Sequence, residues 1–100
     1  MLDQEEHATF EINVALIDIA SLWMAQGFAA RAVRLFGAAQ GVLNKLDASL
    51  GVEQRRYDRY LAAARAQLDE PAFAQAWAEG QAMTLEQAVV YALEDREGRG

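Results

Sequence analysis

The segment over residues 4–26 constrains this fold most, because its pattern predicts one helix with apolar side chains on two sides. At about 100° per residue, two apolar stripes point in almost opposite directions. The first stripe comprises Ile12, Leu16, Ile19 and Trp23, and the second comprises Phe10, Val14, Ile17 and Met24. Glu11 and Asp18 leave a narrow polar seam between them. Such a helix should be packed on both sides, so we expect it to lie between two layers.

The composition favours one small, all-helical domain. A chain of 100 residues suits a single domain with one modest core. Hydrophobic residues make up 53% of the sequence, which is too many for a disordered segment. One proline and seven glycines leave few helix breakers, and alanine is abundant. We therefore predict an all-α domain over residues 1–94, followed by a frayed polar tail over residues 95–100.

The composition also excludes several classes of function. Without cysteine, the chain has no disulfide, thiolate metal site or cysteine nucleophile. A net charge of -6 counts against binding to nucleic acid, which usually requires a positive excess. The acidic start differs from a signal peptide, and the apolar run over residues 14–25 is shorter than the ~20 residues that span a bilayer. These features predict a cytoplasmic protein that binds neither nucleic acid nor membranes.

Capping residues and glycines divide the chain into five predicted helices. The first three cover about residues 4–26, 29–49 and 53–68, with ends at Gly27 and Gly51. Asp3 and Glu6 form a predicted capping box at the first helix. Asp69 or Glu70 caps a short fourth helix with Pro71 in its first turn, and Gly80 weakens its end. Thr84 caps the fifth helix, with Gln87 in capping-box relation. Because the connections are short, we expect neighbouring helices to pack antiparallel.

No group of side chains in the sequence predicts catalysis. His7 is the only histidine, and it falls on an expected solvated first turn without a nucleophile beside it. Metal binding would need several ligands at suitable spacing, and none is visible. We therefore expect no enzyme activity, and no catalytic, cofactor-binding or metal-ligating residue.

Two further patterns allow alternative interpretations. Arg55, Arg56 and Arg59 form a basic cluster, but interleaved acids favour a solvated helix face over a binding site. Gly37 and Gly41 have a spacing that lets another helix approach closely. That helix could belong to this chain or to another one.

The segment from Leu16 to Ala39 resembles one tetratricopeptide repeat. The resemblance rests on the large, small and aromatic positions of two helices and on the turn glycine: Leu16, Ile19, Ala20, Trp23, Gly27, Ala32, Phe36 and Ala39. One departure is Asn44, which stands where the repeat usually ends near a proline. The resemblance therefore implies a terminal or degenerate repeat in a five-helix, tetratricopeptide-like array.

The remainder of the chain resembles the C-terminal helical region of large bacterial transcriptional regulators and signal-transduction ATPases, LuxR-type and related. The likeness covers the segment from Tyr57 to Leu93, where residues 73–89 carry it most clearly, and residues 31–39 match the same proteins upstream. The resemblance implies an intracellular regulator fragment that makes protein contacts and has no catalytic residue.

These observations predict a non-catalytic protein–protein interaction and scaffolding domain, the C-terminal cap of such an array. The expected structural core comprises Leu16, Ile19, Trp23, Phe36, Phe73 and Trp77. The candidate protein interface is the second stripe, Phe10, Val14, Ile17 and Met24, which would receive preceding repeats or a second copy. Alternatively, the later helices of this chain cover both stripes. Two other functions stay open: a self-standing homodimeric helical protein, and a small-ligand sensor with a pocket between the second, third and fourth helices.

Overall fold

The computed structural model describes residues 4–46 and 50–98, with side chains up to Leu93. This part of the chain is helical, with no strand, which confirms the all-α prediction. Its elements are α1 (Gln4–Ala25), α2 (Ala29–Leu46), the short 3₁₀ helix η1 (Gly51–Glu53), α3 (Gln54–Gln67), α4 (Glu70–Gln81) and α5 (Leu85–Gly98).

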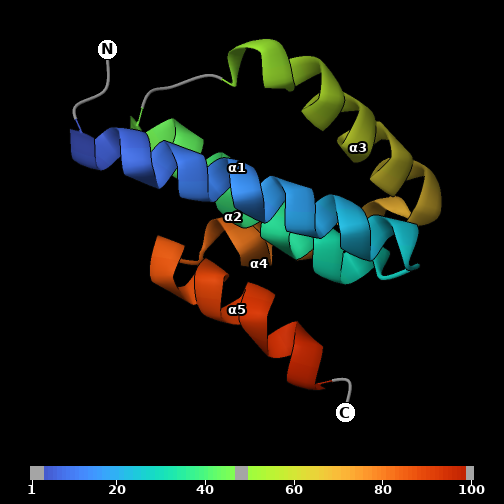
Figure 1. The fold of residues 1–100 in the computed structure, drawn as a ribbon. Coiled ribbons are helices and arrows are strands. Elements are labelled where there is room, and N and C mark those ends of the chain that lie inside the picture. The colour runs from blue at the N-terminus through green and yellow to red at the C-terminus, as the bar shows by residue number, and fades with distance from the viewer. Residues whose placement is uncertain (1–3, 47–49, 99–100) are drawn as a thin grey trace.

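The second helix, α2, is the centre of the fold. It contacts α1, α3, α4 and α5, and its most extensive packing is with α4. Figure 1 shows α1 crossing in front of α2, with α3 along one side and α5 along the other. All positions over residues 35–39 are buried. Because a helix turns about 100° per residue, five consecutive buried positions face every direction around α2.

Two glycines, Gly37 of α2 and Gly80 of α4, let these helices approach closely. A Cβ added at Gly80 would overlap the Arg34 carbonyl oxygen and the Ala38 amide nitrogen of α2. A Cβ at Gly37 would lie 2.5 Å from the carbonyl oxygen of Trp77. At Gly41 the nearest atom would be 3.6 Å away, an ordinary contact. The small-residue spacing on α2 therefore serves packing within this chain, and Gly80 belongs to the same contact.

The helix ends follow from local chemistry. Gly27 adopts φ +92° after α1, a conformation that side chains disfavour. Asp69 caps α4 by accepting a hydrogen bond of 2.9 Å from the Ala72 amide. Thr84 and Gln87 make both bonds of the predicted capping box, at 2.9 and 3.0 Å. The predicted cap at Asp3, like the predicted end of the second helix at residues 47–49, lies outside the described residues.

The C-terminal segment is more helical than expected. The helix α5 continues through Gly98, where the sequence had predicted a frayed tail from residue 95. The good helix formers Glu94, Arg96 and Glu97 explain the continuation. Residues 99–100 lie outside the described part.

The two stripes of α1 prove to be the two edges of one broad buried face. Ala20 and Asn13, which lie between the stripes around the helix, are both fully buried. One edge meets α5, where Trp23 packs edge-to-face on Tyr91 with ring centroids 5.7 Å apart. Near the opposite edge, Arg56 of α3 reaches Asp18 at 3.6 Å. The chain thus covers the second stripe, and Leu16 and Trp23 of the first, with its own helices, whereas Ile12 of the first stripe stays exposed.

The predicted core residues are packed inside, although two lie at its border. Leu16, Trp23, Phe36 and Phe73 are buried, whereas Ile19 and Trp77 are half-buried against the core. The Phe73 and Trp77 rings stack with centroids 5.9 Å apart. On α5, the apolar side chain of Leu93 is exposed.

Candidate protein-interaction surface

The predicted interface on α1 is not an open surface. Ile17 and Met24 are only 5% and 8% exposed, and Phe10 and Val14 are half-buried against the core. The error has a geometric cause. The sequence pattern placed the second stripe opposite the first, whereas α2, α3 and α5 wrap around the sector that both stripes border.

A different row of apolar side chains on α1 remains open. We call it the outer strip, and it comprises Ala8, Ile12, Ala15, Ile19 and Leu22. Ile12 is 43% exposed and Leu22 is 61% exposed, both alanines are exposed, and Ile19 is half-buried. The sequence analysis had assigned Ile12 and Ile19 to the inward stripe, so Ile12 in particular is a correction.

The outer strip has the spacing of a helix–helix seam. Successive members are four, three, four and three residues apart. This is the spacing of the a and d positions in a heptad, which lie along one line of a helix that packs on another helix. Over about 21 Å, at about 1.5 Å per residue, the strip presents a continuous apolar edge. The signal was present in the sequence, but Ile12 and Ile19 were both placed in the first stripe, and the other members of the strip were placed in neither stripe.

Carboxylates border the outer strip. Glu11 and Asp18 each precede a strip isoleucine by one residue, and both are well exposed. His7 Nε2 lies 3.1 Å from Glu11 Oε2. The contact of Asp18 with Arg56, at 3.6 Å, is equally solvent-exposed. Exposed pairs of this kind contribute little to stability. Both carboxylates are thus solvent-exposed beside the strip, and each has one weak exposed contact.

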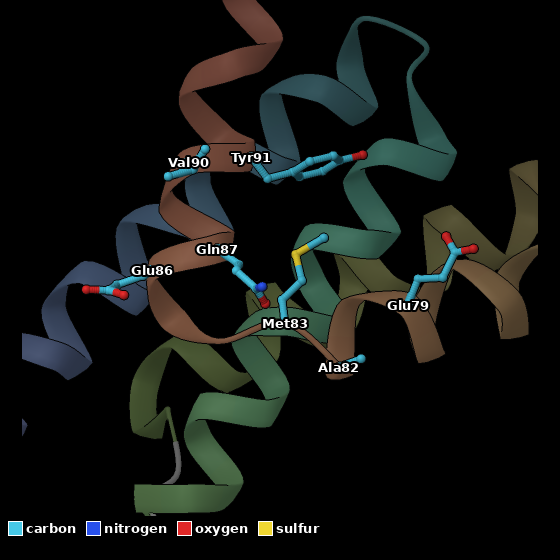
Figure 2. Close-up of a pocket in the computed structure, with 7 residues that line it drawn as sticks. All are labelled: Glu79, Ala82, Met83, Glu86, Gln87, Val90 and Tyr91. Carbon is cyan, nitrogen blue, oxygen red and sulfur yellow. The ribbon is translucent and has the colours of Figure 1, made fainter.

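A hollow lies between the C-terminal end of α4 and α5. Its volume is about 620 Å³, and its lining includes Met83, Val90 and Tyr91 together with the carboxylates of Glu79 and Glu86. Figure 2 shows Gln87 extending from α5 toward Met83. The hollow is wide open to solvent. It differs from the enclosed cavity between the second, third and fourth helices that a small-ligand sensor was expected to contain.

The wall of this hollow is held by an ion pair and by one cation that lies over two aromatic rings. Arg34 Nε donates to Glu79 Oε1 at 2.6 Å, and Arg34 Nη1 donates to the Tyr91 hydroxyl at 3.2 Å. The bond to Arg34 lowers the pKa of Glu79, and the same bond raises the pKa of Arg34. Arg31 lies over the rings of Trp23 and Tyr91, with its guanidinium carbon 5.4 and 5.0 Å from their centroids. These contacts tie α5 to α1, α2 and α4, which is a structural role.

Tyr57 is a buried titratable group at the seam between α3 and α2. Its hydroxyl lies 3.1 Å from Gln40 Oε1 and 3.3 Å from the Phe36 carbonyl oxygen. Burial raises the pKa of Tyr57 above its ordinary value, and the nearby Asp58 carboxylate acts in the same direction. A neutral phenol that donates across a helix seam anchors the fold and has no access to a substrate.

Asn13 is a buried polar residue that sequence reasoning missed. It is fully buried in the centre of the α1 face, where its Nδ2 donates to the Ala39 carbonyl oxygen at 3.0 Å. Its Oδ1 has no hydrogen-bond partner among the described residues. The bond crosses from α1 to α2, so Asn13 fixes the register of the two helices.

The other candidate groups do not assemble into a site. Arg55 and Arg59 are exposed on α3, while Arg56 contacts Glu53 at 3.3 Å. Among residues 4–46 and 50–93, no group of three acidic or histidine side chains could hold a metal ion. His7 is exposed on the first turns of α1, beside Glu11.

By length and composition, α1 could cross a membrane. The helix Gln4–Ala25 is long and apolar enough to span a bilayer, whereas the sequence pattern had indicated only the shorter apolar run over residues 14–25. Core helices of soluble proteins meet the same criterion, and here α1 packs on α2, α3 and α5. The feature is weak evidence and does not settle where the protein resides.

Comparison with known proteins found no matching family model, no matching curated protein and no matching solved structure. The interpretation of this domain therefore depends on its own residues and geometry.

Proposed function

We propose that this chain is a non-catalytic protein–protein interaction domain whose docking face is the outer strip of α1. In this proposal it acts as the end unit of a tetratricopeptide-like array in a cytoplasmic bacterial signalling or transcription regulator. The array and the regulator are supported by the resemblance of residues 16–39 and 57–93 alone. The docking face is supported by geometry.

The observation that carries the proposal is the row of apolar side chains at heptad spacing on the exposed side of α1. Single apolar side chains on a surface mean little. Here Ile12, Leu22 and half-buried Ile19 lie in line, and alanines between them permit close approach of a second helix. In a helical array each unit buries such a face against its neighbour, which explains why a surface helix would keep this row.

The experiment uses a neutral helical probe. A fluorescent peptide with leucine and isoleucine at heptad positions and glutamine at the flanking positions is titrated with the full chain, and anisotropy is recorded. We expect saturable binding that is lost in the double variant Ile12→Glu with Leu22→Glu. The matched control is Val52→Glu, because Val52 is 94% exposed on η1 and lies outside the strip.

Circular dichroism of each variant checks that the helices persist. Since Ile12 and Leu22 are on the surface, their replacement should change the melting temperature little. A folded wild-type chain that ignores the probe, or a double variant that binds it as well as the wild type, would contradict the proposed docking face.

A further inference from the structure

Carboxylates of α1 dominate the charge around the outer strip, although Arg56 of α3 lies 3.6 Å from Asp18 and His7 lies 3.1 Å from Glu11. The α1 sequence contains Glu5, Glu6, Glu11 and Asp18 and has neither lysine nor arginine. Glu11 and Asp18 occupy the flanking position directly before Ile12 and Ile19, where coiled-coil helices place the charges that choose their partners. Glu5 lies seven residues before Ile12, at the N-terminal end of the same line. A helix that docks on the strip therefore meets carboxylates along its length.

We propose that the outer strip binds a basic amphipathic helix, with aliphatic side chains on one line and lysine or arginine beside them. This inference rests on the proposed docking function and adds the chemistry of the partner. Aliphatic residues of the partner cover Ile12, Ile19 and Leu22. Its cations approach Glu11 and Asp18, whose side chains are 69% and 56% exposed.

A second copy of this chain is a poor occupant. A symmetric antiparallel pairing of two outer strips places the acids of one α1 beside those of the other, and each chain carries a net charge of -6. Like charges juxtaposed at an interface are unfavourable. The same acids disfavour an anionic lipid surface, which attracts helices with basic flanks.

The length of the strip determines how long a docked helix can be. A row of about 21 Å, at about 1.5 Å per residue, accommodates roughly four turns of a docked helix. Ala8 and Ala15 leave space opposite them, so large aliphatic residues of the partner can insert between Ile12, Ile19 and Leu22. One short helical segment is sufficient to fill it.

Three peptides with the same apolar line test the charge preference. The flanking positions carry lysine in the first, glutamine in the second and glutamate in the third. Anisotropy titrations with the full chain at low salt should give the tightest binding for the lysine peptide. We expect it to bind at least about tenfold more tightly than the glutamate peptide, equivalent to about 1.4 kcal/mol. The advantage should shrink as salt is added.

A charge-reversal variant provides the decisive comparison. Glu11→Lys with Asp18→Lys should reverse the order, so that the glutamate peptide binds more tightly than the lysine peptide. The control Asp58→Lys with Glu70→Lys changes the net charge equally, at exposed positions on α3 and α4, and should keep the original order. Circular dichroism confirms that both variants stay folded.

The outcomes separate the two proposals. If all three peptides bind equally, the docking face stands and the basic partner is refuted. If none binds, both proposals fail. An α1-dependent dimer seen by sedimentation, or binding to anionic vesicles in preference to the lysine peptide, would also overturn the inference, because a second copy or a lipid surface would then occupy the strip.

Discussion

Gly80→Ala should separate α4 from α2 and destabilise the domain. The added Cβ would overlap the Arg34 carbonyl oxygen and the Ala38 amide nitrogen, both of which are backbone atoms of the central helix. A backbone atom cannot move aside as a flexible side chain can. The two helices must therefore shift relative to each other, and the buried residues between them lose contact.

The cost can be bracketed. Inserting a methyl group into a packed core typically costs about 1–3 kcal/mol, and backbone overlap places this case at the upper end. Alanine regains up to about 1 kcal/mol of helix propensity relative to glycine. The expected net loss is about 2 kcal/mol in the free energy of unfolding, out of about 5–15 kcal/mol for an ordinary domain. For a chain of this size that corresponds to roughly 10 °C in melting temperature.

Gly41→Ala is the matched control on the same pair of helices. Its Cβ would meet its nearest atom, the Gln81 carbonyl oxygen, at 3.6 Å. Because no steric overlap opposes the gain in helix propensity, this variant should be as stable as the wild type or up to about 1 kcal/mol more stable. Urea titrations followed by circular dichroism measure both variants. Equal stabilities for Gly80→Ala and Gly41→Ala would refute the close α2–α4 contact.

Three other substitutions test the remaining packing. Phe73→Ala should lower the free energy of unfolding by about 3–5 kcal/mol, as is usual for a buried aromatic. Trp77→Ala should lower it less, because Trp77 is only half-buried, and thermal unfolding measures both variants. Val14→Glu with Ile17→Glu should abolish the helical circular dichroism signal, since Ile17 is buried; a folded double variant would show that this stripe is surface after all. The pKa of Tyr57 is higher in the folded state than in the unfolded chain, where tyrosine ionises at about pH 10. The contribution of Tyr57 to the free energy of unfolding is therefore full below about pH 10, and it is lost as the pH rises further. Tyr57→Phe should therefore reduce the alkaline fall in stability measured by urea titrations, and an unchanged fall would contradict the burial of this hydroxyl.

Local signals in the sequence specified the helix ends well. The Thr84–Gln87 capping box, the Asp69 cap and the turn at Gly27 all form as expected, because each depends on residues within one turn of a helix. The all-α class follows from the same local preferences. Such signals are independent of the way in which helices pack on one another.

The arrangement of the helices was not accessible in the same way. Short connections predicted that each helix packs beside its neighbours, whereas the most extensive contact joins α2 to α4. That contact depends on Gly80, which looks like a helix breaker in sequence and is a packing residue in the structure. The overlap that a Cβ would cause is a property of two backbones in space, and periodicity along one helix carries no information about it.

The same limit explains the error on α1. Periodicity identified nearly every apolar position on the helix, but it treated apolar character as the measure of burial. The fully buried centre of the face contains Asn13, whose amide donates to the Ala39 carbonyl oxygen, while apolar Ile12 and Leu22 remain on the surface. Burial of a polar residue requires a partner at the right place on another helix, and exposure of an apolar row costs free energy unless something covers it. Apolar periodicity along α1 therefore could not separate the buried face from the exposed row, because the positions of the neighbouring helices decide which side of α1 is covered.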